Sequence, residues 1–187
     1  MRALRLAAAL PATAFLPLPA GAQEHGATAT GEASAAIVQP LSVRQLADLD
    51  FGIVASDAAA GGSVAVSPGS DVRYLGRVRN GCGGSGDCPV PHTAQFSVTG
   101  EMGRSYAIEV PERLAVSGVS ATGQAIAPVL VVSGFSVKTE SWPDSGAAGE
   151  LGPGGSDRFE LGGTLNVPAG LRPARYSTTV DVLVTYR

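Results

Sequence analysis

The chain has 187 residues, of which 44% are hydrophobic and 16% are charged, and its formal net charge is −3. The hydrophobic fraction is sufficient for a packed core, while the low, slightly acidic charge argues against nucleic acid as a partner. The 25 glycines and 13 prolines favour turns and disfavour long helices. Composition therefore excludes a basic nucleic-acid-binding protein and a protein built on long helices.

Residues 1–22 have the pattern of a secretory signal peptide. Arg2 and Arg5 supply a positive start, residues 6–18 form an apolar run, and a small-x-small motif ends at Ala22. A membrane anchor is the weaker interpretation, because the run is too short for a span and prolines interrupt it. We expect cleavage between Ala22 and Gln23. The mature chain would then be exported to the periplasm, to the cell surface or into the medium of a Gram-negative bacterium.

The rest of the chain is predicted to hold a flexible N-terminal arm, residues 23–32, and one β-sandwich domain, residues 33–187. No window of 12 residues in the domain has a helical period, and no later segment is apolar enough to span a membrane. Short β-branched runs instead recur every 8 to 12 residues between turn signals, which indicates an all-β, antiparallel sandwich. The predicted strands lie at residues 37–46, 51–54, 63–66, 71–78, 94–99, 106–110, 129–137, 158–167 and 176–186.

The two cysteines, Cys82 and Cys88, lie in a loop made mostly of glycine and serine. An exported chain meets an oxidising compartment, and the glycines allow the backbone to curl tightly, so we predict a disulfide between them. A redox pair or half of a zinc site is the alternative. Neither fits well, because the spacing is not C-x-x-C and only His92 is near.

Residues 141–157 are rich in glycine and are predicted to form a long mobile loop that carries the only tryptophan, Trp142. Trp142 is a candidate for stacking on a sugar ring, although a tryptophan that packs against the edge of a sandwich is commoner. The loop also carries three acidic side chains. Calcium binding by these acids is conceivable, but solvated loop acids are the simpler interpretation.

Enzyme signatures are missing from the sequence. There is no G-x-S-x-G, H-E-x-x-H or EF-hand motif, and the two histidines, His25 and His92, have no evident catalytic partners. A formal G-x-G-x-x-G begins at Gly81, but Cys88 and Pro89 follow it where a dinucleotide-binding motif requires a helix. We therefore predict no catalytic residue, no metal site and no cofactor.

Several segments in a fixed order resemble a known bacterial family. They include a Leu-Asp-Phe-Gly element at residues 49–52, the alternating runs at residues 96–100 and 106–111, and a last strand that ends in Tyr186. This order resembles the exported proteins called domain of unknown function 4402 (DUF4402). That family is in turn similar to the spore coat protein U and archaic chaperone–usher pilin group.

The resemblance implies an immunoglobulin-like sandwich that lacks one strand, which the N-terminal arm of a neighbouring subunit supplies after a periplasmic chaperone releases it. Such a donor binds through backbone hydrogen bonds at a free sheet edge. The residues with the required period of two are Ala27, Ala29, Gly31, Ala33, Ala35 and Ile37. The candidate acceptor edge is the last strand, with Tyr176, Val180, Val182, Val184 and Tyr186.

Two functions remain open at this stage. The first is a structural or adhesive cell-envelope protein, in which residues 27–38 pass to a neighbour or form the first strand of their own domain. The second is a secreted module that binds a carbohydrate or another ligand through Trp142. The small donor side chains would bind a neighbour weakly, because burying a methyl group contributes only about 0.8 kcal/mol. They therefore favour the alternative in which residues 27–38 form the first strand of their own domain.

Overall fold

The structure is a computed structural model, and it describes residues 38–187 apart from residues 84–87 and 121. The described residues form β-strands and no helix, so the predicted all-β class is confirmed. In chain order the strands are β1 (Ser42–Ala47), β2 (Leu49–Ser56), β3 (Gly62–Ser67), β4 (Asp71–Gly76), β5 (Val78–Asn80), β6 (Ala94–Thr99), β7 (Ser105–Glu109), β8 (Arg113–Val119), β9 (Ala125–Thr139), β10 (Ala148–Glu150), β11 (Ser156–Val167), β12 (Ala174–Thr178) and β13 (Leu183–Tyr186).

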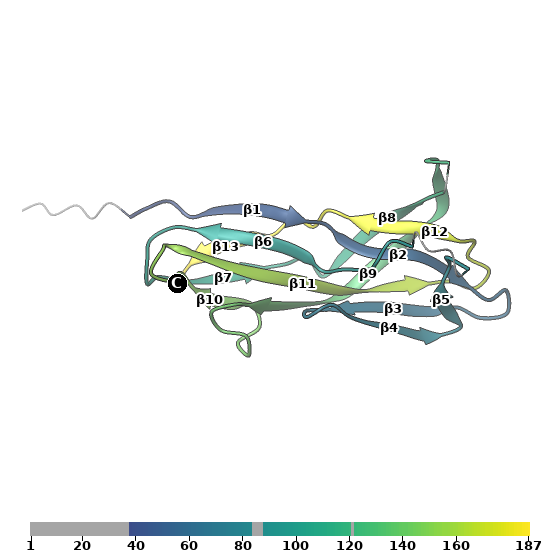
Figure 1. Cartoon of the computed structure of the whole chain (residues 1–187), viewed down its shortest axis with the longest axis horizontal. Coiled ribbons are helices and arrows are strands. Elements are labelled where there is room, and N and C mark those ends of the chain that lie inside the picture. The colour runs from purple at the N-terminus through teal and green to yellow at the C-terminus, as the bar shows by residue number, and fades with distance from the viewer. Residues whose placement is uncertain (1–37, 84–87, 121) are drawn as a thin grey trace, which may run out of the picture. The chain divides into compact units, whose positions relative to one another are not determined.

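The strands make two antiparallel sheets (Figure 1). The larger sheet runs β1-β6-β11-β9-β8-β12-β2-β5, with the β3–β4 hairpin joined to β11, and the smaller sheet runs β10-β7-β13. The long strand β11 pairs with β9 on one side and, on the other, first with β6 and then with β3. A single bridge between Asp50 and His92 links β2 to the segment before β6, so the large sheet curls back toward itself.

The core consists of the inward-facing residues of both sheets, as expected for alternating strands. Its largest fully buried side chains include Tyr106, Tyr176, Phe51 and Phe159. The rings of Phe96 and Phe159 stack with centroids 4.8 Å apart, and they join β6 to β11 inside the sandwich. The Leu-Asp-Phe-Gly element therefore contributes to the centre of the core through Leu49 and Phe51.

The sequence-based prediction of one continuous last strand is wrong. Residues 174–178 form β12, which lies between β2 and β8 in the large sheet, whereas residues 183–186 form β13, which pairs with β7 in the small sheet. Alternating burial continues through the break, since Val180 is buried and Asp181 is exposed. The alternation records which side chains face the core, but it does not record which strand is the neighbour.

Other strand boundaries also differ from the prediction. The predicted strand at residues 71–78 divides into β4 and β5, because Gly76 has a φ of +73° and turns the chain between two partner strands. Among the described residues, the first strand begins at Ser42, and residues 38–41 of the predicted strand at 37–46 are not part of it. The prediction missed β8 and the short strand β10 altogether.

Candidate functional site

The first and the last strands of the domain both change sheet partners, and they do so at the same place. The strand just before Asp48, β1, pairs with β6, whereas the strand just after it, β2, pairs with β12. Likewise, the strand before residues 179–182, β12, pairs with β2, whereas the strand after them, β13, pairs with β7. The Thr179 hydroxyl donates to Asp48 Oδ1 at 3.2 Å. This side-chain contact lies where the segment that contains β1 and β2 separates from the segment that contains β12 and β13.

A second contact joins the same two segments at the other end, after β13 and before β1. The Tyr186 hydroxyl donates to the carbonyl of Gln39 at 2.8 Å and accepts the N–H of Glu101 at 2.7 Å. The Arg104 guanidinium lies 5.1 Å from the centre of the Tyr186 ring and adds a cation–π contact. Because Thr179 meets Asp48 while Tyr186 meets Gln39, residues 179–186 run antiparallel to residues 39–48.

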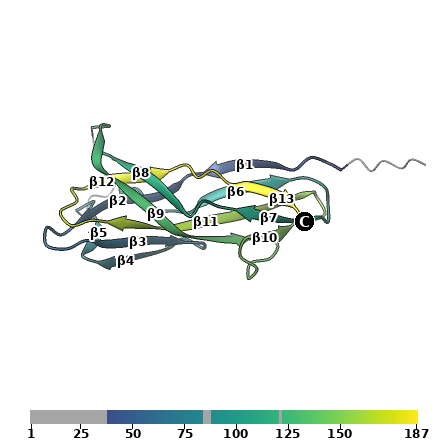
Figure 2. The ribbon, with the colours of Figure 1, turned by 180° about the vertical axis from the view of Figure 1, so that it is seen from behind.

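Between these two contacts, β1 and β13 each end a sheet. In the described part of the chain, β1 pairs only with β6 and β13 pairs only with β7 (Figures 1 and 2). We call these two unpaired edges, residues 42–47 and 183–186, the open seam. Its rims carry exposed hydrophobic side chains, Val43, Leu46 and Leu183, and Leu183 is 56% exposed.

The predicted acceptor residues lie in three different places: on β12, between β12 and β13, and on β13. Tyr176 lies on β12, which has a neighbour on both sides, so it is not at an edge. Val180 is buried between the strands, while Val184 and Tyr186 lie on the free strand β13. The candidate acceptor edge is therefore the short strand β13, together with the edge of β1 that the sequence analysis did not identify.

An ion pair between the buried Asp50 and the half-exposed Arg175 links the strands beside the seam. The Asp50 carboxylate is 2% exposed, and its Oδ1 accepts the N–H of Gly52 at 2.7 Å. Its Oδ2 accepts Arg175 Nε at 3.1 Å and also Arg175 Nη2. The hydrogen bond to Asp50 raises the pKa of the Arg175 guanidinium above its usual value. Asp50 therefore ties β2 to β12 next to the place where their continuations separate.

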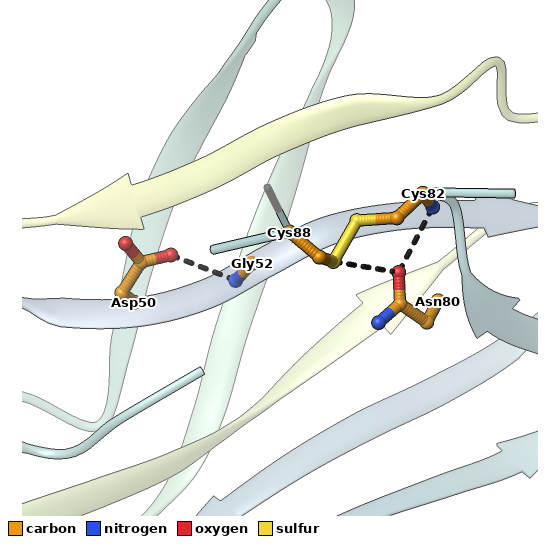
Figure 3. The surroundings of a disulfide bond; sticks show 5 residues. All are labelled: Asp50, Gly52, Asn80, Cys82 and Cys88. Carbon is orange, nitrogen blue, oxygen red and sulfur yellow. Dashed lines mark hydrogen bonds between the residues drawn. A yellow bond between two sulfur atoms is a disulfide. The ribbon is translucent and has the colours of Figure 1, made fainter. Parts of the chain in front are cut away.

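The disulfide predicted between Cys82 and Cys88 is present (Figure 3). The Asn80 side-chain oxygen accepts the N–H of Cys82 at 2.9 Å, which positions the start of the loop. Figure 3 shows the bond close to the β2 segment that contains Gly52. Gly52 has a φ of +70°, and a Cβ there would lie 3.0 Å from the carbonyl oxygen of Pro89, so glycine allows the chain after Cys88 to pass closely over β2.

The segment predicted to be a long mobile loop, residues 141–157, is held in place. Asp157 Oδ2 accepts the hydroxyls of Tyr106, at 2.7 Å, and of Ser141, at 2.5 Å. The segment also contains β10, which pairs with β7. Burial, reinforced by the hydrogen bond to Asp157, raises the pKa of Tyr106 far above its usual value, so its hydroxyl remains a donor. The prediction missed this network because its members are far apart in the sequence.

Trp142 lies on this segment and is 36% exposed. The Thr139 hydroxyl donates to the Trp142 carbonyl at 3.1 Å and fixes the backbone there. A cavity of about 370 Å³ lies beside the segment on the outer face of β6, β11 and β9. Its lining includes Leu46, Lys138, Arg158 and Pro143, so Trp142 itself is next to the cavity wall rather than in it.

The predicted signal peptide, the predicted cleavage position and the candidate donor strand all lie outside the described residues. In the part of the chain that the structure describes, no helix is long and apolar enough to cross a membrane.

The described residues define an antiparallel, all-β sandwich-like protein with curled sheets and a disulfide. The chain belongs to the family described as domain of unknown function (DUF4402), whose model matches residues 41–186. No curated protein and no solved structure matches the chain.

Proposed function

We propose that this protein is an exported, non-enzymatic structural or adhesive subunit of the cell envelope that assembles by donor-strand addition. The observation that carries the proposal is the open seam, in which β1 and β13 end their sheets opposite each other between the Asp48–Thr179 and Gln39–Tyr186 contacts. The pilin-like character of the protein is part of this proposal.

The physical reason is that an unpaired edge exposes backbone N–H and C=O groups that another strand can satisfy. The N–H of Arg187 donates to the carbonyl of Ser105, and hydrogen-bonded pairs alternate along an antiparallel ladder. Thr185 and Leu183 therefore bond to β7, while Val184 and Tyr186 direct their backbone groups toward the seam. An incoming strand that runs antiparallel to β13 would run parallel to β1.

The proposed donor is the segment that carries Ala27, Ala29, Gly31, Ala33, Ala35 and Ile37, taken from a neighbouring copy or a related subunit. Methyl groups bury little area, so backbone hydrogen bonds would supply most of the binding free energy. A periplasmic chaperone would cover the same edges before assembly. The signal peptide pattern and the disulfide support export to an oxidising compartment.

The test is to look for heat-sensitive ladders when native surface extract is run on a denaturing gel without boiling. The discriminating variant is Val184→Pro, which removes an N–H that points to the seam but no hydrogen bond to β7. We expect ladders from the wild type and from the matched control Val184→Ala, and only monomer from Val184→Pro with an unchanged β-sheet circular dichroism spectrum. Ladders that persist in Val184→Pro, or a wild type that is strictly monomeric on the cell, would contradict the proposal.

A second candidate function is a secreted module that binds a carbohydrate or another ligand. The cavity of about 370 Å³ beside Pro143 favours it, since Lys138, Arg158 and other polar side chains line its wall. Binding of the wild type on a glycan array, and its loss in Arg158→Ala, which removes a lining side chain, would support binding in the cavity. Loss in Trp142→Ala would place the ligand on the neighbouring tryptophan instead. An array on which the wild type binds no glycan would contradict carbohydrate binding as the function.

A further inference from the structure

The cavity on the outer face of β6, β11 and β9 is lined by turns as well as by strands. The turn between β3 and β4 contributes Gly69, and the loop between β9 and β10 contributes Pro143. Both views show this turn and this loop along the same side of β11 (Figures 1 and 2). The volume of about 370 Å³ lies within the range of roughly 300–1,000 Å³ that is typical of small-molecule sites.

The strands under the cavity carry two cations and two carboxylates as cross-strand neighbours. Lys138 on β9 lies opposite Glu160 on β11. The N–H of Glu140, just after β9, donates to the carbonyl of Arg158 at 2.9 Å, so these two residues are neighbours as well. Lys138 and Arg158 therefore lie on one diagonal, with backbones roughly 7–8 Å apart. Both side chains are exposed and line the cavity, so both can reach the same group of a ligand.

The two cations are not neutralised by their neighbours. In the part of the chain that the structure describes, neither Lys138 nor Arg158 has an ion-pair partner. The Glu160 carboxylate, which is next to Lys138 in the sheet, instead accepts the N–H of Gly69 through Oε2 at 2.7 Å. An arginine fork binds a carboxylate through two parallel hydrogen bonds, and a lysine ammonium adds a further charge-assisted bond. This diagonal is therefore suited to a ligand carboxylate.

The other lining groups limit the charge of the ligand and favour a sugar. The two cations and the carboxylates of Glu140 and Glu160 sum to zero (2 − 2 = 0), so a ligand with many negative groups would be repelled by these carboxylates. Glu140 and Gln95 can accept hydrogen bonds from hydroxyl groups. Leu46 and Pro143 offer apolar surface to the C–H groups of a ring. One carboxylate together with several hydroxyls is the composition of an acidic sugar.

We propose that this cavity binds a sugar ring that carries one carboxylate, as in a uronic or a sialic acid. Arg158 and Lys138 hold the carboxylate, while Glu140 and Gln95 accept hydroxyl groups. This inference rests on the second candidate function, a secreted ligand-binding module, and narrows it to acidic carbohydrate. It does not depend on donor-strand addition, because no backbone group of the open seam takes part.

The experiment is isothermal titration calorimetry of the full exported protein at low salt. The ligands are a trisaccharide with one glucuronic acid, 3′-sialyllactose, and the methyl ester of each, which keeps the size and the hydroxyls but removes the charge. We expect at least one acid to bind about tenfold more tightly than its ester, since the ester loses the charge-assisted bonds. Which acid binds distinguishes a uronic from a sialic acid. A heparin oligosaccharide, with several sulfates, should bind more weakly than that acid.

The variants assign the binding to the cavity. Arg158→Ala should weaken binding of the acid about tenfold, and Arg158→Lys should recover part of the loss, because an ammonium cannot present the fork. Lys138→Ala should also weaken it. Arg113→Ala is the matched control, since Arg113 is an exposed arginine on β8 outside the cavity lining, and it should bind as the wild type does. Circular dichroism of each variant establishes that the sheet still folds.

The failure of this inference is distinguishable from the failure of the second candidate function. Equal affinity for each acid and its ester would overturn the acidic-sugar proposal, and so would acid binding that Arg158→Ala leaves unchanged. A wild type that binds none of these ligands would overturn it too. If neutral glycans nevertheless bind on the array and Arg158→Ala abolishes their binding, the ligand-binding module stands without the preference for a carboxylate.

Discussion

The Tyr186 hydroxyl connects the last strand to the chain before the first strand by donating to the carbonyl of Gln39, and it also accepts the N–H of Glu101. One phenol oxygen therefore satisfies two backbone groups from segments 62 residues apart (101 − 39 = 62). It does so at the end of the open seam, where no strand of the described residues lies between β1 and β13.

Tyr186→Phe should lower the free energy of unfolding by about 1–2 kcal/mol, because both backbone groups lose their partner while the ring is kept. Equilibrium denaturation in urea measures this loss. Thr185→Ser, on the same strand, has no side-chain hydrogen bond to lose and is the matched control. A Tyr186→Phe variant as stable as the control would show that water replaces the hydroxyl without cost.

Removing either partner of the Asp50–Arg175 pair should also destabilise the protein. Arg175→Ala leaves the buried Asp50 carboxylate with only the N–H of Gly52, so we expect a loss of about 2–3 kcal/mol. Arg175→Lys should recover part of it, because an ammonium cannot match both Nε and Nη2 of the guanidinium. Thermal melting of the wild type and of both variants measures their order of stability, which we expect to be wild type, then Arg175→Lys, then Arg175→Ala. Equal stability of Arg175→Ala and Arg175→Lys would contradict a role for the ion pair.

Tyr106 should make stability depend on pH in the alkaline range. Its folded pKa is raised above the usual 10.0, first by burial and then by the bond to Asp157. The folded state therefore keeps the proton that the unfolded state releases, and this contribution is full below pH 10 and decreases as the pH rises above it. Burial raises the pKa of Tyr74 and Tyr176 too. Tyr106→Phe should reduce the slope of unfolding free energy between pH 10 and pH 11, measured in urea, without abolishing it.

Reduction of the Cys82–Cys88 disulfide should cost about 2 kcal/mol, the loop-closure entropy of a short loop, and should not unfold the protein. The reason is that the core of Leu49, Phe51 and Phe159 lies outside this loop. Cys82→Ser with Cys88→Ser, compared with wild type in the presence and absence of reductant, isolates the effect. Global unfolding of the double variant would show that the loop organises the core.

Periodic burial made much of the fold predictable. The strands around Phe96, Tyr106 and Leu161 show a clear alternation, and each is a strand in the structure. The segment at residues 113–119 was missed although it also alternates, with Val116 and Gly118 inward, because its outward positions carry few strongly polar side chains. The Asp157 network could not be foreseen, since it joins Tyr106 and Ser141 across long separations.

The sequence by itself determined the all-β class, the disulfide between two cysteines six residues apart and the inward faces of most strands. These features depend on local composition, on a period of two and on short loops, so a short stretch of sequence is enough to predict each of them. Only the tertiary structure decided that the last strand divides at residues 179–182, that Asp50 pairs with Arg175, and that β1, β4 and β13 each have one edge that no other described strand pairs with. Strand pairing depends on which distant segments meet, and a sequence pattern records only which side of each strand faces the core.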